Sequence, residues 1–579
     1  MIHICYIHVF TFGVLRNIGL SFDYRYKFKW EDKCLIIAKN MGAMPDGFWG
    51  NGIYSLTAIV GNNGCGKTTA LRLMKRLFVE GAPRDEDAGV LIVYEYQGDL
   101  LVYNPTGVNI SATSNIHIID VHERLSINTL YYSGHYQPYN GDEDMELSGS
   151  YEASDGWLLV HDLQAYANID SMHLSEPLYN HLNAYYAQNN YRICEILSLK
   201  GLRKLLSTVR LPRYVQFTPN RSGWNAIKLD RMGRFEGLEV PGERLTSRAL
   251  REQALERLVY YDILNLIAEG KGELQELFDF LKEWVNAPKE SGIVAALEHR
   301  MKVGQNASEA QKALGAVYYV IQKIESLCEF DEKSRTFYVD MEHENSKLRS
   351  MLDEMIKSPF FLTARFFDIV YSHNLLEAVH LSSGEQELLN LLSRLYDGIM
   401  IKPQRFHNIE SPRLLLLDEA EIGFHPDWQR HYVKVLTEFM NYMRVKAGFD
   451  FQIVITSHSP IILSDVPVSC VNFLRLRGEN TVLVSNEKET FGENVFRLYR
   501  RGFFMENGLI GEFARDKIKA LEAAIEEGEV SEVLYRQVEM IGDERIRDYL
   551  MRRMARQNVD AEIAYHEAKI RELRNRRGI

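Results

Sequence analysis

Short apolar runs separated by turn residues fill the first 130 residues of this chain. The segments Ile2–Tyr26, Ile53–Val60 and Gly89–Tyr103 are rich in Ile, Val, Phe and Tyr, which predicts strands of a sheet. A helical pattern runs from Ala70 to Phe78, and a further strand-like run covers Leu130–Tyr132. This alternation of strand and helix patterns predicts an α/β domain.

The pattern becomes mostly helical after about residue 140, and buried-strand runs return at Arg413–Asp418 and Gln452–Thr456. From Gly511 onward the pattern is again helical and highly charged. We therefore expect an α/β head domain split into two halves by an insertion, followed by a helical tail. The expected parts are residues 1–140 for the first half of the head, 141–359 for a mostly helical insertion, 360–510 for the second half, and 511–579 for a helical partner-docking region.

Composition narrows the class of protein. Of 579 residues, 46% are hydrophobic and 25% are charged, which excludes wholesale disorder. The net charge of −12 excludes a surface that is uniformly basic. The six cysteines include no C-x-x-C pair, and no run of about 18 apolar residues occurs, so we expect a cytoplasmic protein without a membrane segment.

Two local segments are nevertheless basic. Arg203–Arg251 holds eleven Lys and Arg against four Asp and Glu, with aromatic residues between them. This mixture suits contacts with DNA or RNA, but it equally suits an irregular solvated lobe whose aromatic side chains pack inward. Arg545–Ile579 holds ten basic residues against five acidic ones in an amphipathic pattern, which favours partner docking over DNA binding, with a plain solvated tail as the alternative.

A phosphate-binding loop follows the second predicted strand. Gly61-x-x-x-x-Gly66-Lys67-Thr68 matches the P-loop pattern between a strand and a helix. Glycines let successive backbone N–H groups point at phosphate oxygens, while Lys67 supplies a charge to the β- and γ-phosphates and Thr68 a hydroxyl to Mg²⁺. The residues expected to hold the nucleotide here are Gly61, Asn62, Asn63, Gly64, Cys65, Gly66, Lys67, Thr68 and Thr69.

A second chemical signal lies far downstream, where the apolar run from Leu414 to Leu417 ends in Asp418 and Glu419. Ligands of parallel sheets bind at the carboxyl ends of the strands. We expect Asp418 to hold Mg²⁺ and Glu419 to polarise the attacking water as a general base. An apolar run ending in two acids is a weak signal by itself and becomes specific in combination with the P-loop.

Two further segments resemble motifs of the ABC-type ATPases. Leu381-Ser382-Ser383-Gly384-Glu385-Gln386 looks like their signature motif, and Thr456-Ser457-His458-Ser459-Pro460 looks like their switch-histidine loop. The resemblance implies ATP and Mg²⁺ as ligands and a dimer, or a higher oligomer, whose heads sandwich ATP. Ser382, Ser383, Gly384 and Glu385 would then cap the γ-phosphate held by the partner, and His458 would contact the γ-phosphate. Gln137 is the candidate for the glutamine loop, with an ordinary surface glutamine as the alternative.

The large insertion is similar to that of the RecF/SMC/Rad50-like branch and unlike a transporter subunit. It lacks sustained heptads and a C-x-x-C hook, so we expect neither a long coiled coil nor a zinc clasp. The segments 418–429, 490–494 and 508–514 resemble stand-alone bacterial ATPases of anti-phage systems such as Septu and the retrons. That resemblance implies a separate nuclease effector, because no nuclease motif occurs in this chain.

Two other functions remain open at this point. The first is a RecF/SMC-like ATPase of DNA repair or maintenance that acts directly on DNA. The second is a scaffold locked by ATP, in which hydrolysis is negligible and the nucleotide only stabilises an assembly.

Overall fold

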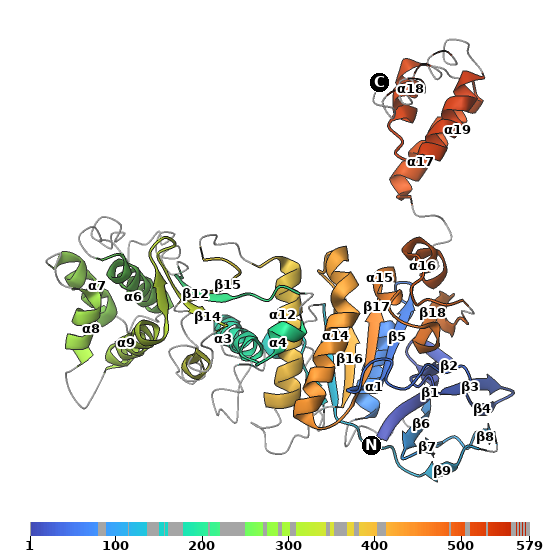
Figure 1. Cartoon of the computed structure of the whole chain (residues 1–579), viewed down its shortest axis with the longest axis horizontal. Coiled ribbons are helices and arrows are strands. Elements are labelled where there is room, and N and C mark those ends of the chain that lie inside the picture. Colours follow the sequence, from blue (N-terminus) through green and yellow to red (C-terminus); the bar gives the residue numbers. More distant parts are fainter. Residues whose placement is uncertain are drawn as a thin grey trace. The chain divides into compact units, whose positions relative to one another are not determined.

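The fold is taken from a computed structural model of the whole chain (Figure 1). The residues it describes are 2–78, 89–113, 115–135, 150–155, 157–159, 162, 178–206, 209–220, 249–269, 275–287, 292–301, 308–342, 348–352, 367–375, 381–401, 413–485, 488–503, 510–528, 531–556, 563, 567, 570 and 574.

A mixed sheet forms the centre of the larger unit, which spans Met1–Leu498 (Figure 1). Its strands follow the order β11 (Ser150–Glu152), β10 (Thr129–Ser133), β16 (Leu414–Asp418), β17 (Phe451–Ser457), β5 (Ile53–Gly61), β18 (Val471–Arg477), β19 (Asn480–Leu483), β2 (Leu15–Ser21), β1 (Ile2–Phe12), β6 (Val90–Tyr96), β7 (Asp99–Tyr103) and β9 (Ile118–Val121). The strands from β11 to β18 run parallel, and the remaining pairs are mostly antiparallel. The α/β fold predicted from the sequence is confirmed.

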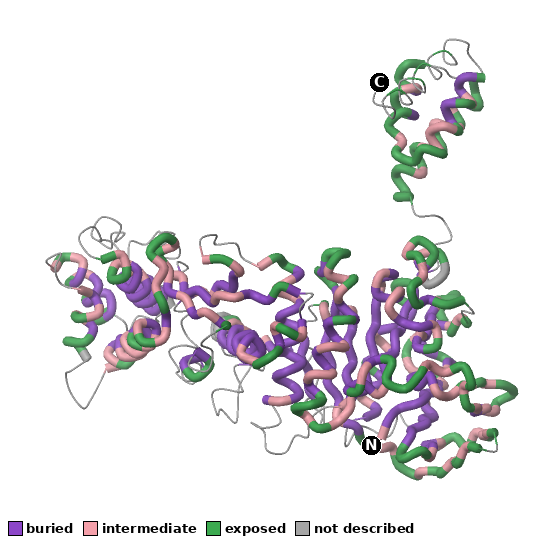
Figure 2. The backbone as a smooth tube through the Cα atoms, in the orientation of Figure 1, coloured by how far each residue is buried: buried purple, intermediate pink, exposed green. Residues whose placement is uncertain are grey.

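The parallel strands are buried because helices and sheets cover both of their faces. All five residues of β16 are buried (Figure 2), as expected for a central parallel strand. Helix α1 (Lys67–Leu77) buries Ala70, Leu71 and Met74 in one core cluster with residues of β1, β5, β16 and β17. Helix α14 (Pro426–Ala447) packs near β5 and α12, followed by the short helices α15 (Pro460–Leu463) and η4 (Val468–Cys470).

A small sheet covers the antiparallel part. It contains β3 (Tyr26–Glu31), β4 (Cys34–Lys39) and β8 (Asn109–Ala112). Leu35 and Ile37 of β4 pack with Leu91, Val93 and other buried residues of β1, β6 and β7. The antiparallel part is therefore a two-layered structure beside the P-loop strand.

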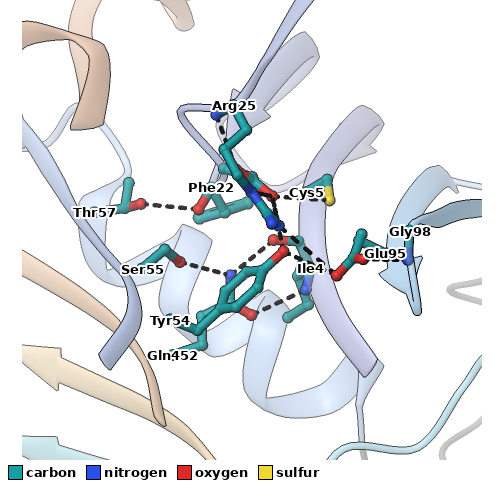
Figure 3. Close-up of polar contacts among 11 residues, drawn as sticks. Ile4, Cys5, Phe22, Arg25, Tyr54, Ser55, Thr57, Glu95, Gly98 and Gln452 are labelled. Carbon is teal, nitrogen blue, oxygen red and sulfur yellow. Dashed lines mark hydrogen bonds and ion pairs between the residues drawn. The ribbon is translucent and has the colours of Figure 1, made fainter. Parts of the chain in front are cut away.

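A buried polar network joins the antiparallel strands to the parallel core (Figure 3). The Gln452 side chain of β17 accepts from the Ile4 N–H at 2.9 Å and donates to the Ile4 carbonyl at 2.7 Å, as a neighbouring strand would. The Tyr54 hydroxyl lies 2.9 Å from a carboxylate oxygen of Asp23 and 3.0 Å from one of Glu95. These bonds fix β1 and β6 relative to β5, the strand that leads into the P-loop.

The insertion contains helices and a second sheet. The helices are α3 (Leu178–Leu197), α4 (Leu202–Leu205), α6 (Leu250–Glu269), α7 (Gln275–Asn286), α8 (Ile293–Met301) and α9 (Glu309–Leu327). The sheet is antiparallel, in the order β13 (Glu329–Asp331), β14 (Thr336–Asp340), β12 (Tyr214–Pro219) and β15 (Phe367–Ser372). The sequence analysis did not predict this sheet, because its strands are three to six residues long and widely separated.

Helix α3 of the insertion contacts α12 (Ser383–Tyr396) and the π-helix η3 (Asp397–Ile401), which directly follows α12. Helix α12 begins at the predicted signature. The fully buried Arg192 of α3 forms ion pairs with Asp162 and Asp397. Asn189 donates to the side-chain oxygen of Asn390 at 3.0 Å. The signature helix and the insertion therefore share one polar interface.

The second compact unit spans Tyr499–Ile579, and α16 (Val495–Gly502) runs across its boundary. Helices α17 (Glu512–Glu526), α18 (Glu532–Glu539) and α19 (Glu544–Ala555) enclose their own core of Ile525, Leu534, Val538, Leu550, Met551 and Met554. Among the described residues, no helix is long and apolar enough to span a bilayer.

Candidate active site

Four parallel strands bring the predicted site residues to one edge of the sheet. Ser133 of β10 is level with Asp418 of β16, which is level with Thr456 of β17. Ser457 of β17 is in turn level with Val60 of β5. The carboxyl ends of these strands therefore meet, although β5 and β10 belong to the first half of the head and β16 and β17 to the second.

The loop after β5 has the conformation that a phosphate-binding loop needs. A Cβ on Gly61 would lie 2.0 Å from the Leu474 carbonyl oxygen of β18, so only glycine fits this close approach. Gly66 has a φ of 89°, in the left-handed region, and caps the first turn of α1. Asn62, Asn63 and Gly64 are exposed, whereas Cys65 is buried and Thr69 is half-buried. Backbone N–H groups and the helix start thus face an accessible edge.

Lys67 is buried behind this loop. Its Nζ lies 2.6 Å from His458 Nε2 and 3.3 Å from the Asn62 carbonyl oxygen. It also lies 3.9 Å from Glu419 Oε1. The ammonium group, the histidine and the carboxylate predicted from separate motifs are therefore in contact.

Asp418 has the surroundings of a metal-binding carboxylate. Thr68 Oγ1 lies 3.2 Å from Asp418 Oδ1, Thr456 Oγ1 lies 2.6 Å from the same oxygen, and the Tyr131 hydroxyl donates to Oδ2 at 3.0 Å. A hydroxyl and a carboxylate are hard oxygen donors, which Mg²⁺ prefers. Thr68 and Asp418 fit this ion in donor chemistry.

Glu419 is held in an unusual backbone conformation between two histidines. Its φ of 46° is left-handed, a strained state for a residue other than glycine that is common at functional sites. His135 Nε2 lies 2.8 Å from Oε2, and His458 Nε2 lies 3.1 Å from Oε1. Although partial burial opposes ionisation, the contacts with His458, His135 and Lys67 lower the pKa of Glu419 to about 2. The carboxylate is therefore ionised at neutral pH.

The predicted signature residues make their contacts elsewhere. Ser382 caps α12: its Oγ accepts from the Glu385 N–H at 3.3 Å, and the Glu385 carboxylate accepts from the Ser382 N–H at 2.8 Å. His373, which follows β15, lies 2.9 Å from Glu385 Oε1. Ser383 is exposed, and Gly384 packs so closely on Trp428 that a Cβ would come within 3.0 Å of its ring.

The sequence analysis missed two members of the site, and one of its candidates lies outside the described residues. His135 stands beside Glu419, and Glu421 accepts a hydrogen bond from Ser457, the residue before His458. The only sequence signal for His135 is its place shortly after a predicted strand. The structure shows that this strand, β10, pairs in parallel with β16. Gln137, two residues further on, is not among the described residues.

Part of the basic segment Arg203–Arg251 is also described, and three of its cations, Arg203, Arg213 and Arg251, bond within the lobe. Arg203 donates to the carbonyl oxygens of Leu211 and Pro212, and Arg213 pairs with Asp340 at 2.8 Å. Arg251 donates to the Glu325 carbonyl at 3.1 Å. Residues 207–208 and 221–248 of the segment lie outside the described residues, so binding of DNA or RNA there stays a prediction.

Comparison with known proteins gives partial matches. Residues 332–464 match the family described as "AAA domain, putative AbiEii toxin, Type IV TA system". Protein ea59 of Escherichia phage lambda is 30% identical over 145 residues, which are 25% of this chain and 24% of that protein. The Retron Vc95 probable ATPase of Vibrio cholerae serotype O1 biovar El Tor is 26% identical over 118 residues, which are 20% of this chain and 21% of the relative. The chain thus spans about a quarter of the length of these relatives.

Two solved structures match over 84% of this chain. The recombination mediator protein RecF-ATPrS of the RecFOR pathway matches over 98% of its length with 13% identity and a TM-score of 0.24. The Smc head domain from Pyrococcus furiosus, bound to the C-terminal domain of ScpA, matches over 96% of its length with 11% identity and a TM-score of 0.25. At such TM-scores neither likeness supports a conclusion about this chain.

The family match covers the segment that carries the predicted signature, the carboxylate strand and His458, and the P-loop precedes it in the same sheet. The α/β head and the partial matches support the ATPase resemblance predicted from the sequence: parts of the chain are similar to an AAA-domain family and to a probable ATPase of a retron.

Proposed function

We propose that this chain binds and hydrolyses ATP at the edge formed by β5, β10, β16 and β17. The observation that carries the proposal is the convergence of Lys67 at the start of α1, Asp418 and Glu419 at the end of β16, and His458 after β17, each within 2.6 to 3.9 Å of a neighbour. Such clusters of buried charge with strained backbone are typical of catalytic sites.

The residues have distinct roles in this proposal. Backbone N–H groups of residues 61–69 and the Lys67 ammonium hold the phosphates. Mg²⁺, bound by Thr68 and Asp418, would neutralise charge on the β- and γ-phosphates. Glu419 accepts a hydrogen bond from the attacking water, and His458 contacts the γ-phosphate. Because a carboxylate with a pKa of about 2 is a weak base, Glu419 acts mainly by orienting the water, as suits the loose transition state of phosphoryl transfer.

The signature residues support a dimer in which each head completes the site of the other. Ser383 is exposed at the start of α12. Ser382 and Glu385 form hydrogen bonds with each other rather than with Lys67 or Glu419. In the proposed dimer, Ser382, Ser383, Gly384 and Glu385 cap the γ-phosphate bound to the partner. ATP then stabilises the closed state, and hydrolysis releases it.

The proposed biological role is control of a separate nuclease effector in anti-phage defence. The partial similarity to a retron ATPase supports this role. The C-terminal region, residues 511–579, is the proposed docking site for the effector. Phe513, Val533 and Met540 lie more than 60% exposed on its helices, which is consistent with a binding surface.

Three purified forms of the full chain test the ATPase proposal. The wild type should release phosphate from ATP over many turnovers in the presence of Mg²⁺. Lys67→Ala should lose binding of a fluorescent ATP analogue, whereas Glu419→Gln should bind it and accumulate as an ATP-bound dimer in size-exclusion chromatography. A wild-type chain that binds ATP without turnover would instead support a nucleotide-locked scaffold.

The same preparation separates the defence role from direct action on DNA. Turnover that rises upon addition of DNA to the chain alone would favour a repair or maintenance ATPase. Co-purification of a nuclease subunit from the native host, lost on deleting residues 511–579, would support the proposed effector control.

A further inference from the structure

A histidine outside the recognised motifs contacts the proposed catalytic carboxylate. His135 lies two residues after the end of β10, and its Nε2 is 2.8 Å from Glu419 Oε2. Its side chain is 49% exposed, so it stands at the open side of the site rather than in the core. Among the described residues, His135 is the hydrogen-bond partner of the Glu419 side chain that belongs to no predicted motif.

The backbone before His135 is built for this contact. The Gly134 N–H donates to the Asp418 carbonyl oxygen at 2.9 Å. A Cβ on Gly134 would lie 2.3 Å from the Glu419 carbonyl oxygen, so glycine is required for β10 and β16 to end this close together. The His135 N–H donates to Ser133 Oγ at 3.2 Å, which fixes the start of the loop. The position of His135 relative to Glu419 is therefore set by the two strand ends.

Of the two histidines, His135 has the less divided contact with Glu419. His458 Nε2 lies 2.6 Å from Lys67 Nζ as well as 3.1 Å from Glu419 Oε1, so it divides its contacts between two partners. Among the described contacts, His135 Nε2 faces Glu419 Oε2 alone, at 2.8 Å.

We propose that His135 is a positioning residue for ATP hydrolysis, which donates to Glu419 Oε2 and so turns Oε1 toward the attacking water. This inference rests on the proposed ATPase function. Glu419 needs such a restraint because its side chain leaves a strained backbone at the end of β16, where no helix or strand continues to orient it. No proton is transferred by His135; the imidazole N–H only holds the carboxylate.

The test compares His135→Ala and His135→Gln with a matched control in the full chain. Gln keeps a donor near the position of Nε2, whereas Ala removes it. The control is His117→Ala: His117 is 70% exposed and pairs with Asp99 at 3.2 Å next to β9, so it is a second surface histidine–carboxylate pair of similar geometry. Steady-state turnover gives kcat and KM, a fluorescent ATP analogue gives the affinity, and thermal melting reports on folding.

For His135→Ala we expect kcat to fall roughly 10- to 100-fold, the range for partners that orient a catalytic ligand, while nucleotide affinity and melting temperature stay within experimental error. His135→Gln should recover most of the lost kcat, free imidazole should partly rescue His135→Ala because the site is open, and His117→Ala should match the wild type. Turnover of His135→Ala within twofold of the wild type would overturn the inference, and so would a loss of kcat that Gln and imidazole both fail to restore. If the wild type itself shows no turnover, the proposed function fails; if the wild type is active and Glu419→Gln is not, only the role of His135 is in question.

Discussion

A buried carboxyl behind the site makes stability depend on pH in a direction that can be measured. Glu421 follows β16 and is buried, and the Ser457 hydroxyl donates to its Oε1. Its Oε2 has no hydrogen-bond partner among the described residues. Burial is the main cause that raises the pKa of Glu421 from 4.5 to about 7, and the Ser457 hydrogen bond opposes this only in part.

The sign and size of the effect follow from linkage between proton binding and folding. The folded state binds the proton of Glu421 more tightly than the unfolded state does. The stability that this provides is complete below pH 4.5 and is lost as the pH rises through about 7. A shift of about 2.5 units corresponds to roughly 3 kcal/mol in the free energy of unfolding.

Glu421→Gln removes the ionisation and keeps an oxygen that accepts from Ser457. We expect the variant to exceed the wild type by up to about 3 kcal/mol at pH 8.5 and to equal it near pH 4. Urea unfolding followed by tryptophan fluorescence reports on the larger unit, Met1–Leu498, which contains Glu421, because all six tryptophans precede residue 499. Glu479→Gln, the same change at an exposed turn between β18 and β19, is the control. A difference between Glu421→Gln and the wild type that is the same at both pH values would refute the reasoning.

Three further substitutions test the surroundings of the site. Gly134→Ala places a Cβ against the Glu419 carbonyl oxygen and should lower turnover about 10- to 100-fold with nucleotide binding retained, as measured by kcat and by analogue affinity. Gln452→Leu deprives the buried Ile4 N–H of its acceptor and should reduce the unfolding free energy by roughly 2 to 4 kcal/mol in urea. Arg192→Met leaves the buried Asp162 and Asp397 without their cation and should reduce the unfolding free energy by roughly 3 to 5 kcal/mol. An unchanged urea midpoint for Gln452→Leu or for Arg192→Met would contradict the contacts assigned to that residue.

The parts of the site that could be predicted are those encoded by a local pattern. The loop from Gly61 to Thr68 needs glycines at fixed spacing, and the run from Leu414 to Asp418 needs four apolar residues because both of its faces are covered. Those patterns are visible without a structure. That Lys67 and His458 lie in contact follows only from the order of the strands, which the resemblance to ABC-type ATPases supplied and composition did not.

The parts that could not be predicted depend on contacts between segments without a motif. Ser133-Gly134-His135 has no pattern of its own, and its importance arises because β10 happens to pair with β16. The candidate Gln137, which lies outside the described residues, was chosen by its residue type and its place after the apolar run that ends at Ser133. Similarly, β13 is too short for a periodic signal and is defined by its pairing with β14. The β-like pattern around β15 predicts a strand of the head, whereas β15 pairs with β12 of the insertion.

The contacts of Glu419 suggest how the insertion can influence the chemistry. One side of Glu419 is set by β17 through His458, and the other by β10 through His135. Strand β10 pairs with β11, whose Tyr151 donates to Asp397 at 2.9 Å, and Asp397 is paired with Arg192 of α3. The insertion is thus joined to the His135 side of the carboxylate by hydrogen bonds and by backbone pairing, and to the signature helix by the same aspartate. In the proposed mechanism Glu419 works by its position, so a small shift of β10 relative to β17 would change the rate without changing any residue proposed to touch ATP.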